Sequence, residues 1–196
     1  MYKKQMTLQR VVCYLLLAAA VIVFIYSLGI MTDMYENNFA YLAEDPESPI
    51  VEGTEIYYNM QEFNQSLTGA GILLLLLAVS QFAAQTHCRR KYYIANYITV
   101  GVTAVVNIAV SAWALIQVFS YKAQYLLVDF EGVAFWAEIL GKSYTESTFW
   151  FDISIFVFGF LLLITVLSVL NVIWKIMLMK AEKALLTEGK EDTVNA

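Results

Sequence analysis

The sequence has little of the side-chain chemistry on which enzymes and metal proteins depend. It contains one histidine, His87, and two cysteines, Cys13 and Cys88, in 196 residues. A zinc site needs a full set of such ligands, and haem bound by two histidines is excluded by count. Phosphate-binding glycine loops, nucleophile elbows and nucleic-acid-binding motifs are also missing. We therefore expect no catalytic residue, no metal, no cofactor and no nucleic-acid partner, and we expect the protein not to be an enzyme.

Charge is missing from four long runs of 22 to 30 residues each. About 20 apolar residues of helix cross the hydrocarbon core of a bilayer. The runs do not alternate apolar and polar residues as barrel strands do, and the first is too long for the apolar part of a signal peptide. The sequence therefore predicts an all-α integral membrane protein. Its expected spans are about 11–32, 65–87, 93–120 and 151–175, and residues 176–196 form a tail.

Only two of the twelve lysines and arginines lie in the two long loops, residues 32–64 and 121–150. The other ten lie before the first span, in the short turn between the second and third spans, or after Trp174. Because cations mark the cytoplasmic side of membrane helices, both termini and the short turn are predicted to be cytoplasmic. The expected fold is an up-down-up-down four-helix bundle with two outward loops that carry helical extensions. Neither outward loop has a cysteine, which suits a bacterial plasma membrane.

The short turn between the second and third spans holds three consecutive cations, Arg89, Arg90 and Lys91. We interpret this basic cluster first as a topology anchor, because positive charge keeps a loop in the cytoplasm. Attraction of anionic membrane lipids is a second role that the same charges could have. Docking of a cytoplasmic partner is a third.

The outward loops are acidic and aromatic. The acids of the segment AEDPESPIVEGTE lack the spacing of a calcium loop, and we expect them to be solvated. In the second loop, Val133 and Ala137 share a helical face with Phe130. The aromatic residues that are candidates for contact with a partner are Phe130, Phe135, Trp136, Phe149 and Trp150. The alternative is that these rings form the aromatic belt at the membrane surface.

A stripe of polar, uncharged residues runs along the third predicted span. Its members follow at intervals of three or four residues and are Asn96, Thr99, Thr103, Asn107 and Ser111. Such stripes commonly join neighbouring helices through hydrogen bonds inside the membrane. The alternative is that the stripe lines a polar pore.

Sequence signals predict where the helix of the fourth span starts and where it stops. Asp152 lies at its outer boundary, where a carboxylate either favours the start of a helix or pairs with Lys142. At the other end the helix is predicted to continue past Trp174 and to stop near Thr187, because Gly189 is a typical stop signal.

Four short segments of the chain resemble a group of small, uncharacterised four-span bacterial membrane proteins. They are RRKYYIANY in the short turn, YKAQYLLVDFE after the third span, STFWFD at 147–152 and LMKAEKALL at 178–186. Members of this group are encoded beside the permeases of carbohydrate ABC transporters. The resemblance implies a partner, namely ABC permease subunits, and it implies no catalytic residue.

Two functions remain as expectations. The first is a non-catalytic accessory or stabilising subunit of a bacterial ABC-type transporter, with membrane lipids and permease subunits as its neighbours. The alternative is a small autonomous channel or transporter that acts as an oligomer, since four helices alone scarcely enclose a path.

The predicted orientation is testable by cysteine labelling in intact cells. In a variant without the two native cysteines, Ser48→Cys or Ser143→Cys should react with a membrane-impermeant maleimide, whereas Thr187→Cys should react only after lysis. The reason is that the cations place both termini inside the cell. Labelling of Thr187→Cys in intact cells would reverse the predicted orientation.

Overall fold

The computed structural model describes residues 2–36, 42, 49–86 and 93–194, and in these residues all regular structure is helical. The helices are α1 (Tyr2–Glu36), α2 (Ile56–Thr86), α3 (Tyr93–Tyr125), α4 (Phe130–Leu140) and α5 (Phe149–Val194). Four of them, α1, α2, α3 and α5, are long and apolar enough to cross a membrane. The prediction of an all-α membrane protein with four spans is therefore confirmed.

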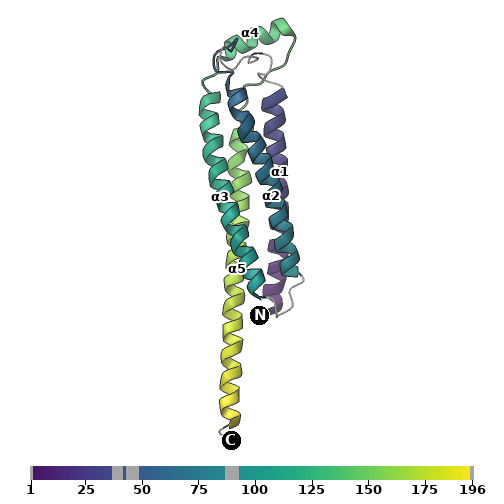
Figure 1. The fold of residues 1–196 in the computed structure, drawn as a ribbon, viewed down its shortest axis with the longest axis vertical. Helices are drawn as coiled ribbons and strands as arrows, with labels where there is room; N and C mark the ends of the chain where they lie inside the picture. Colours follow the sequence, from purple (N-terminus) through teal and green to yellow (C-terminus); the bar gives the residue numbers. More distant parts are fainter. Residues whose placement is uncertain (1, 37–41, 43–48, 87–92, 195–196) are drawn as a thin grey trace.

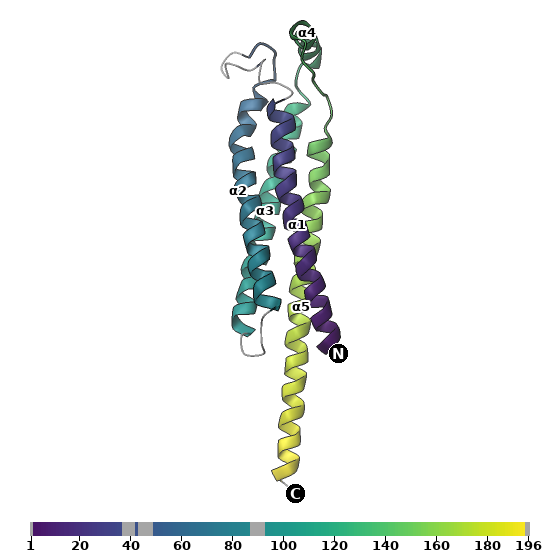
Figure 2. The same ribbon diagram turned by 90° about the vertical axis from the view of Figure 1, so that its right-hand side faces the viewer.

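The four long helices pack as the corners of a square. α1 packs on α2 and α5, and α3 packs on the same two helices. In Figure 1 and Figure 2, α1, α2, α3 and α5 run along one common axis, and α4 lies across one end of it. We call that end the cap end. The opposite end, which carries the N terminus, the end of α2 and the start of α3, we call the basic end (Figure 1).

Helix α5 ends seven residues beyond the stop that the sequence predicts. It runs for 46 residues to Val194 and leaves the other helices behind at the basic end (Figure 1). The predicted stop near Thr187 is wrong, because the helix passes through Gly189. A single glycine costs a helix only about 1 kcal/mol relative to alanine, and Lys190 and Glu191 are good helix formers on its far side.

Near the cap end the bundle is held by rings and close backbone packing. The Tyr26 hydroxyl donates to the backbone oxygen of Trp150 over 3.0 Å, and its ring lies edge-on to Phe158 with the ring centres 5.8 Å apart. Gly29 lies directly under the indole of Trp150, so that an added Cβ would come within 2.2 Å of the ring. Helix α1 can approach α5 this closely only because residue 29 has no side chain.

An ion pair joins α3 to the start of α5 at the same end. The Lys122 ammonium contacts one oxygen of Asp152, and the Thr148 hydroxyl donates to the other oxygen over 2.6 Å. Asp152 lies in the first turn of α5, where a negative charge is favoured. Of the two alternatives for Asp152, the pairing with Lys142 is wrong: Lys142 is exposed, and the carboxylate is engaged by Lys122, thirty positions earlier in the chain.

The cap is made by both long loops together. The backbone N–H of Asp129 donates to the carbonyl of Glu52 over 3.2 Å, and the Asp129 side chain then accepts from the N–H of Gly132 to cap α4. Gly53 has a φ of +88°, and a Cβ there would meet the backbone of Val128 at 2.8 Å. The two loops therefore fit each other tightly, and α4 is fixed at both ends, since Gly141 closes it in the left-handed conformation.

The contact between Gly29 and Trp150 predicts a stability difference between two glycine-to-alanine changes. Gly29→Ala should lower the free energy of unfolding by about 1–3 kcal/mol, because its Cβ overlaps the indole ring. Gly159→Ala, in α5, is the matched control: no atom lies within 4 Å of the place that its Cβ would take, so it should be neutral or slightly stabilising. Melting temperatures in mild detergent measure both. Equal melting temperatures would contradict the close approach.

Candidate functional site

The half of the bundle toward the basic end has a polar interior. Buried polar side chains come from all four long helices and follow each helix at intervals of three, four or seven residues. We call these residues the polar core: Gln5 and Gln9 from α1, Gln81 and Gln85 from α2, Asn96, Thr103, Asn107 and Ser111 from α3, and Thr165, Ser168, Asn171 and Lys175 from α5. Each is at most 4% exposed.

The middle of the polar core is joined across the bundle by hydrogen bonds. The Asn107 amide donates to the Thr165 hydroxyl over 2.8 Å, and Thr165 donates in turn to the Leu161 carbonyl. The Gln81 amide donates to the Ser168 hydroxyl over 2.7 Å, which links α2 to α5. Because hydrocarbon offers no hydrogen bonds, each such bond favours the assembled bundle.

The space at this level is closed. It is lined by Leu16, Gln81, Val100, Thr103, Ala104, Asn107, Thr165 and Ser168 and is too small to hold a water molecule. The Thr103 and Ser111 hydroxyls are buried and have no hydrogen-bond partner there. Of the stripe that the sequence singles out on the third span, four residues face the interior, and Thr99 lies half-buried at its edge.

At the basic end a second set of bonds ties α1 to its two neighbours. The Gln5 amide donates to Gln9 over 3.1 Å and to Asn171 of α5 over 3.2 Å. The Gln9 amide donates to the backbone oxygen of Gln85 over 2.9 Å, and the thiol of Cys13 donates to the Gln85 side chain. The cysteine thus belongs to the polar core's network and is not in a disulfide.

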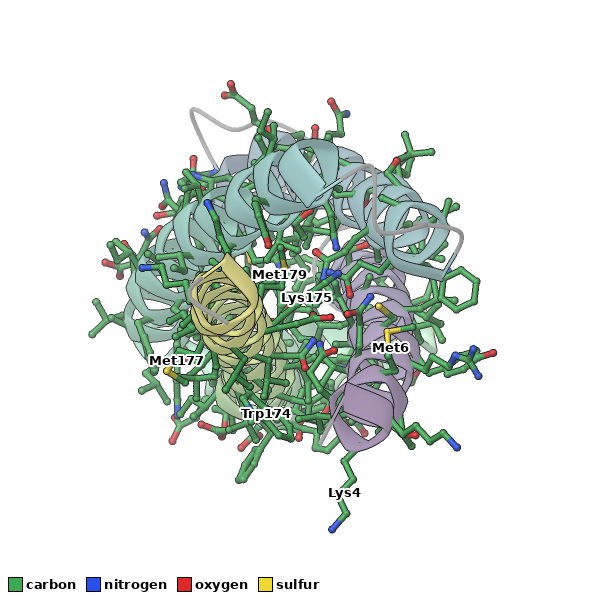
Figure 3. The ribbon with its side chains drawn as sticks, turned by 90° about the horizontal axis from the view of Figure 1, so that it is seen from below. Lys4, Met6, Trp174, Lys175, Met177 and Met179 are labelled. Carbon is green, nitrogen blue, oxygen red and sulfur yellow. The ribbon has the colours of Figure 1, made fainter. Side chains whose placement is uncertain are left out.

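Lys175 is the residue that sequence reasoning missed. From the charge pattern, Lys175 is only one of the cations beyond the last predicted span. In the structure its side chain is buried, with 4% of the residue exposed. Figure 3 shows its side chain pointing from α5 into the bundle, toward α1. The sequence does contain a signal for this, since Ser168, Asn171 and Lys175 follow at intervals of three and four and so share one face of α5.

Some side-chain groups of the polar core have no hydrogen-bond partner. Both side-chain amide atoms of Asn96 are buried and have no hydrogen-bond partner, and the same is true of the side-chain oxygen of Gln5. A buried amide without partners is costly. The network of the polar core thus leaves the Asn96 amide and the Gln5 side-chain oxygen unsatisfied.

The five aromatic residues proposed for partner contact divide into two groups. Phe130 packs on the Tyr125 ring, Trp136 is half-buried against the apolar core, and Trp150 covers Gly29. Phe135 and Phe149 are exposed at 60% and 54%. These two are the most exposed of the five rings, and the other three are partly exposed.

Other exposed apolar residues on α4 were not found from the sequence. Val133 and Ala137 are buried on one face of the helix, Phe135 and Ile139 are exposed on the opposite face, and Leu140 is exposed at the end of the helix. We call Phe135 and Ile139 the cap surface. Phe135 and Ile139 are four residues apart and therefore adjacent on the helix, which is a signal that the sequence does contain.

Two further expectations concern the basic cluster and metals. Arg89, Arg90 and Lys91 lie outside the described residues, as does His87. In the parts of the chain that the structure describes, no three His, Cys, Asp or Glu side chains lie close enough to hold a metal ion.

The fold and the composition of the helices define a multi-pass helical membrane protein. Comparison with protein-family models, with curated proteins and with solved structures found no match to this chain.

The bond between Gln81 and Ser168 predicts a measurable coupling. In a double-mutant cycle, Gln81→Ala and Ser168→Ala should each destabilise the bundle, and the coupling energy should be about 0.6–1.7 kcal/mol, the range for hydrogen bonds between membrane helices. Ser80→Ala is the control, because that serine is exposed on the same helix. The unfolding free energy in detergent reports each value. Strict additivity of the two changes would show that the bond contributes nothing.

Proposed function

We propose that the protein is a non-catalytic accessory or stabilising subunit of a bacterial ABC-type transporter, of the kind that carries carbohydrates. The observation that carries the proposal is the cap surface, which presents Phe135 and Ile139 side by side on a helix that is capped at both ends. The permease partner itself comes from the sequence resemblance in four segments of the chain.

The cap surface is a suitable place for a protein partner because it is both apolar and fixed. Burying one phenylalanine side chain is worth about 1.5–3 kcal/mol, and aromatic anchors on rigid elements dominate many interfaces. Asp129 and Gly141 cap the two ends of α4, and the first loop supports it from below. Binding of a partner therefore costs little conformational entropy, because α4 is already ordered before binding.

The acids beside the cap surface indicate which partner surface fits. Glu131 and Glu138 are exposed on α4 with Phe135 between them in sequence. Carboxylates so close to the apolar residues disfavour burial of α4 in lipid, and they favour a protein surface with an apolar pocket and a basic rim.

For the orientation in the membrane we propose that the bundle crosses up-down-up-down, with the cap end outside and the basic end in the cytoplasm. The supporting facts are the ten cations of the termini and the short turn, against two in the long loops. The cap would then lie near the external entrance of a transporter. An autonomous channel would have to form its path between copies, since the centre of one bundle is closed where its polar residues meet.

Removal of the exposed phenylalanine ring tests the proposal. Phe135→Ala should reduce recovery of co-expressed permease subunits with a tagged copy about tenfold, because an aromatic anchor is lost. Phe156→Ala is the matched control: it removes the same ring from a residue that is 76% exposed on α5 within the apolar span. Recovery is measured by quantitative mass spectrometry after purification in mild detergent.

Two outcomes would contradict the proposal. One is that Phe135→Ala and Phe156→Ala reduce recovery equally. The other is that the tagged protein purifies alone in several mild detergents while the permeases assemble and transport equally well without it. Ion flux from vesicles that contain only this protein would then favour the channel.

A further inference from the structure

We propose that a groove on the outer face of α1 at the basic end binds one anionic glycerophospholipid, with Lys3 and Lys4 holding its phosphate and with Leu8 and Val11 contacting its acyl chain. The groove lies at the opposite end of the bundle from the cap surface. Binding there requires neither the transporter partner nor a particular orientation of the bundle in the membrane.

The groove is formed by one face of α1 and is open to the outside. It has a volume of about 430 Å³ and is lined by Lys3, Lys4, Thr7, Leu8 and Val11. Small-molecule sites have volumes of about 300–1,000 Å³. All five lining residues are exposed, and Figure 3 shows Lys4 extending outward from α1. A ligand can therefore enter from the surrounding membrane without any movement of the helices.

The two lysines make this groove positive. The first acid of α1 is Asp33, near the other end of the helix, and in the described part of the chain no carboxylate forms an ion pair with Lys3 or Lys4. Their flexible four-carbon stems allow both ammonium groups to reach one phosphate. The Thr7 hydroxyl donates to the backbone oxygen of Lys3 over 3.1 Å and is already engaged. The free cations of the groove therefore favour an anionic ligand.

Beyond the lysines the same side of α1 offers an apolar track. Leu8, Val11, Leu15 and Ala18 follow at intervals of three or four residues and so lie along one side of the helix. Leu15 is half-buried and the other three are exposed. Leu8 and Ala18 are about 15 Å apart along the axis, which is half of the roughly 30 Å hydrocarbon core. An acyl chain of one leaflet can therefore lie against this track.

The order of charge and apolar surface along α1 favours a phospholipid over other occupants. The apolar span of α1 begins at Lys3, so the two lysines lie at one end of the span, where lipid headgroups lie. A free phosphate would use only the lysines and would leave Leu8 and Val11 uncovered, whereas a phospholipid covers both parts of the groove. A two-fold contact between copies of the chain would bring the same lysines together, and like charges disfavour it.

The experiment measures how much anionic lipid the full-length protein retains. Nanodiscs of phosphatidylcholine with a minor fraction of phosphatidylglycerol receive the protein, which is then released into mild detergent, and its bound lipids are counted by native mass spectrometry. The double variant Lys3→Gln/Lys4→Gln should lower the retained phosphatidylglycerol about tenfold, because each cation near a membrane surface contributes several-fold. The matched control Arg10→Gln/Lys180→Gln removes two exposed cations that do not line the groove, and it should change retention less than about threefold.

A second pair of variants tests the groove without changing its charge. Val11→Trp places a ring in the space of the acyl chain and should lower the retained phosphatidylglycerol about fourfold, which corresponds to the lost burial of one methylene group. Val105→Trp is the matched control, because Val105 is 68% exposed on α3 and does not line the groove. It should leave retention unchanged. Glycerol phosphate, which has the phosphate but no acyl chain, is added in a parallel sample as a competitor.

Equal retention by the wild type and Val11→Trp would overturn the proposal, whatever the lysine variant does, because the groove would then take no part. So would equal losses in Lys3→Gln/Lys4→Gln and its control, which would indicate only general surface attraction. Displacement of phosphatidylglycerol by millimolar glycerol phosphate would reject the lipid and assign the groove to a soluble anion. If Val11→Trp instead lowers recovery of a second copy of the chain and leaves lipid retention unchanged, the occupant is protein.

Discussion

The demand that buried polar groups find their hydrogen bonds inside the protein organises the basic-end half of this bundle. Hydrocarbon supplies no partners, so Gln81 must lie opposite Ser168, and Asn107 opposite Thr165. Each of these bonds fixes the axial position of one helix against another. Apolar packing alone would tolerate sliding by a fraction of a turn, because leucine and isoleucine surfaces are not directional.

The two ends of the bundle are held by different kinds of contact. Toward the cap end the rings of Tyr26, Trp150 and Phe158 interlock, and the backbone at Gly29 leaves no spare space. Toward the basic end, amides hold the helices, and an amide can exchange one partner for another; Gln5 alone donates to both Gln9 and Asn171. The cap end is thus held by close packing of rings and backbone, and the basic end by hydrogen bonds between side chains.

The sequence predicts the parts of the structure that depend on runs and periods. Four uncharged runs correspond to the four long helices, and intervals of three and four place the stripe from Asn96 to Ser111 on one face. Contacts between distant residues were not predictable. Nothing in the chain near Asp152 indicates that Lys122 is its partner, and nothing near Trp150 indicates that Gly29 lies beneath it. The burial of Lys175 escaped prediction because a lysine after an apolar run is ordinarily in water.

Burial of Lys175 has a structural consequence for α5 as a whole. Asn171, four residues before this lysine, contacts Gln5 near the start of α1, and α5 continues beyond the other three helices to Val194 (Figure 1). Under the proposed orientation, a shift of α5 toward the membrane centre would carry the ammonium into hydrocarbon, at a cost of about 2.5–3.5 kcal/mol. A shift the other way would separate Asn171 from Gln5. The lysine and the asparagine therefore oppose sliding in both directions.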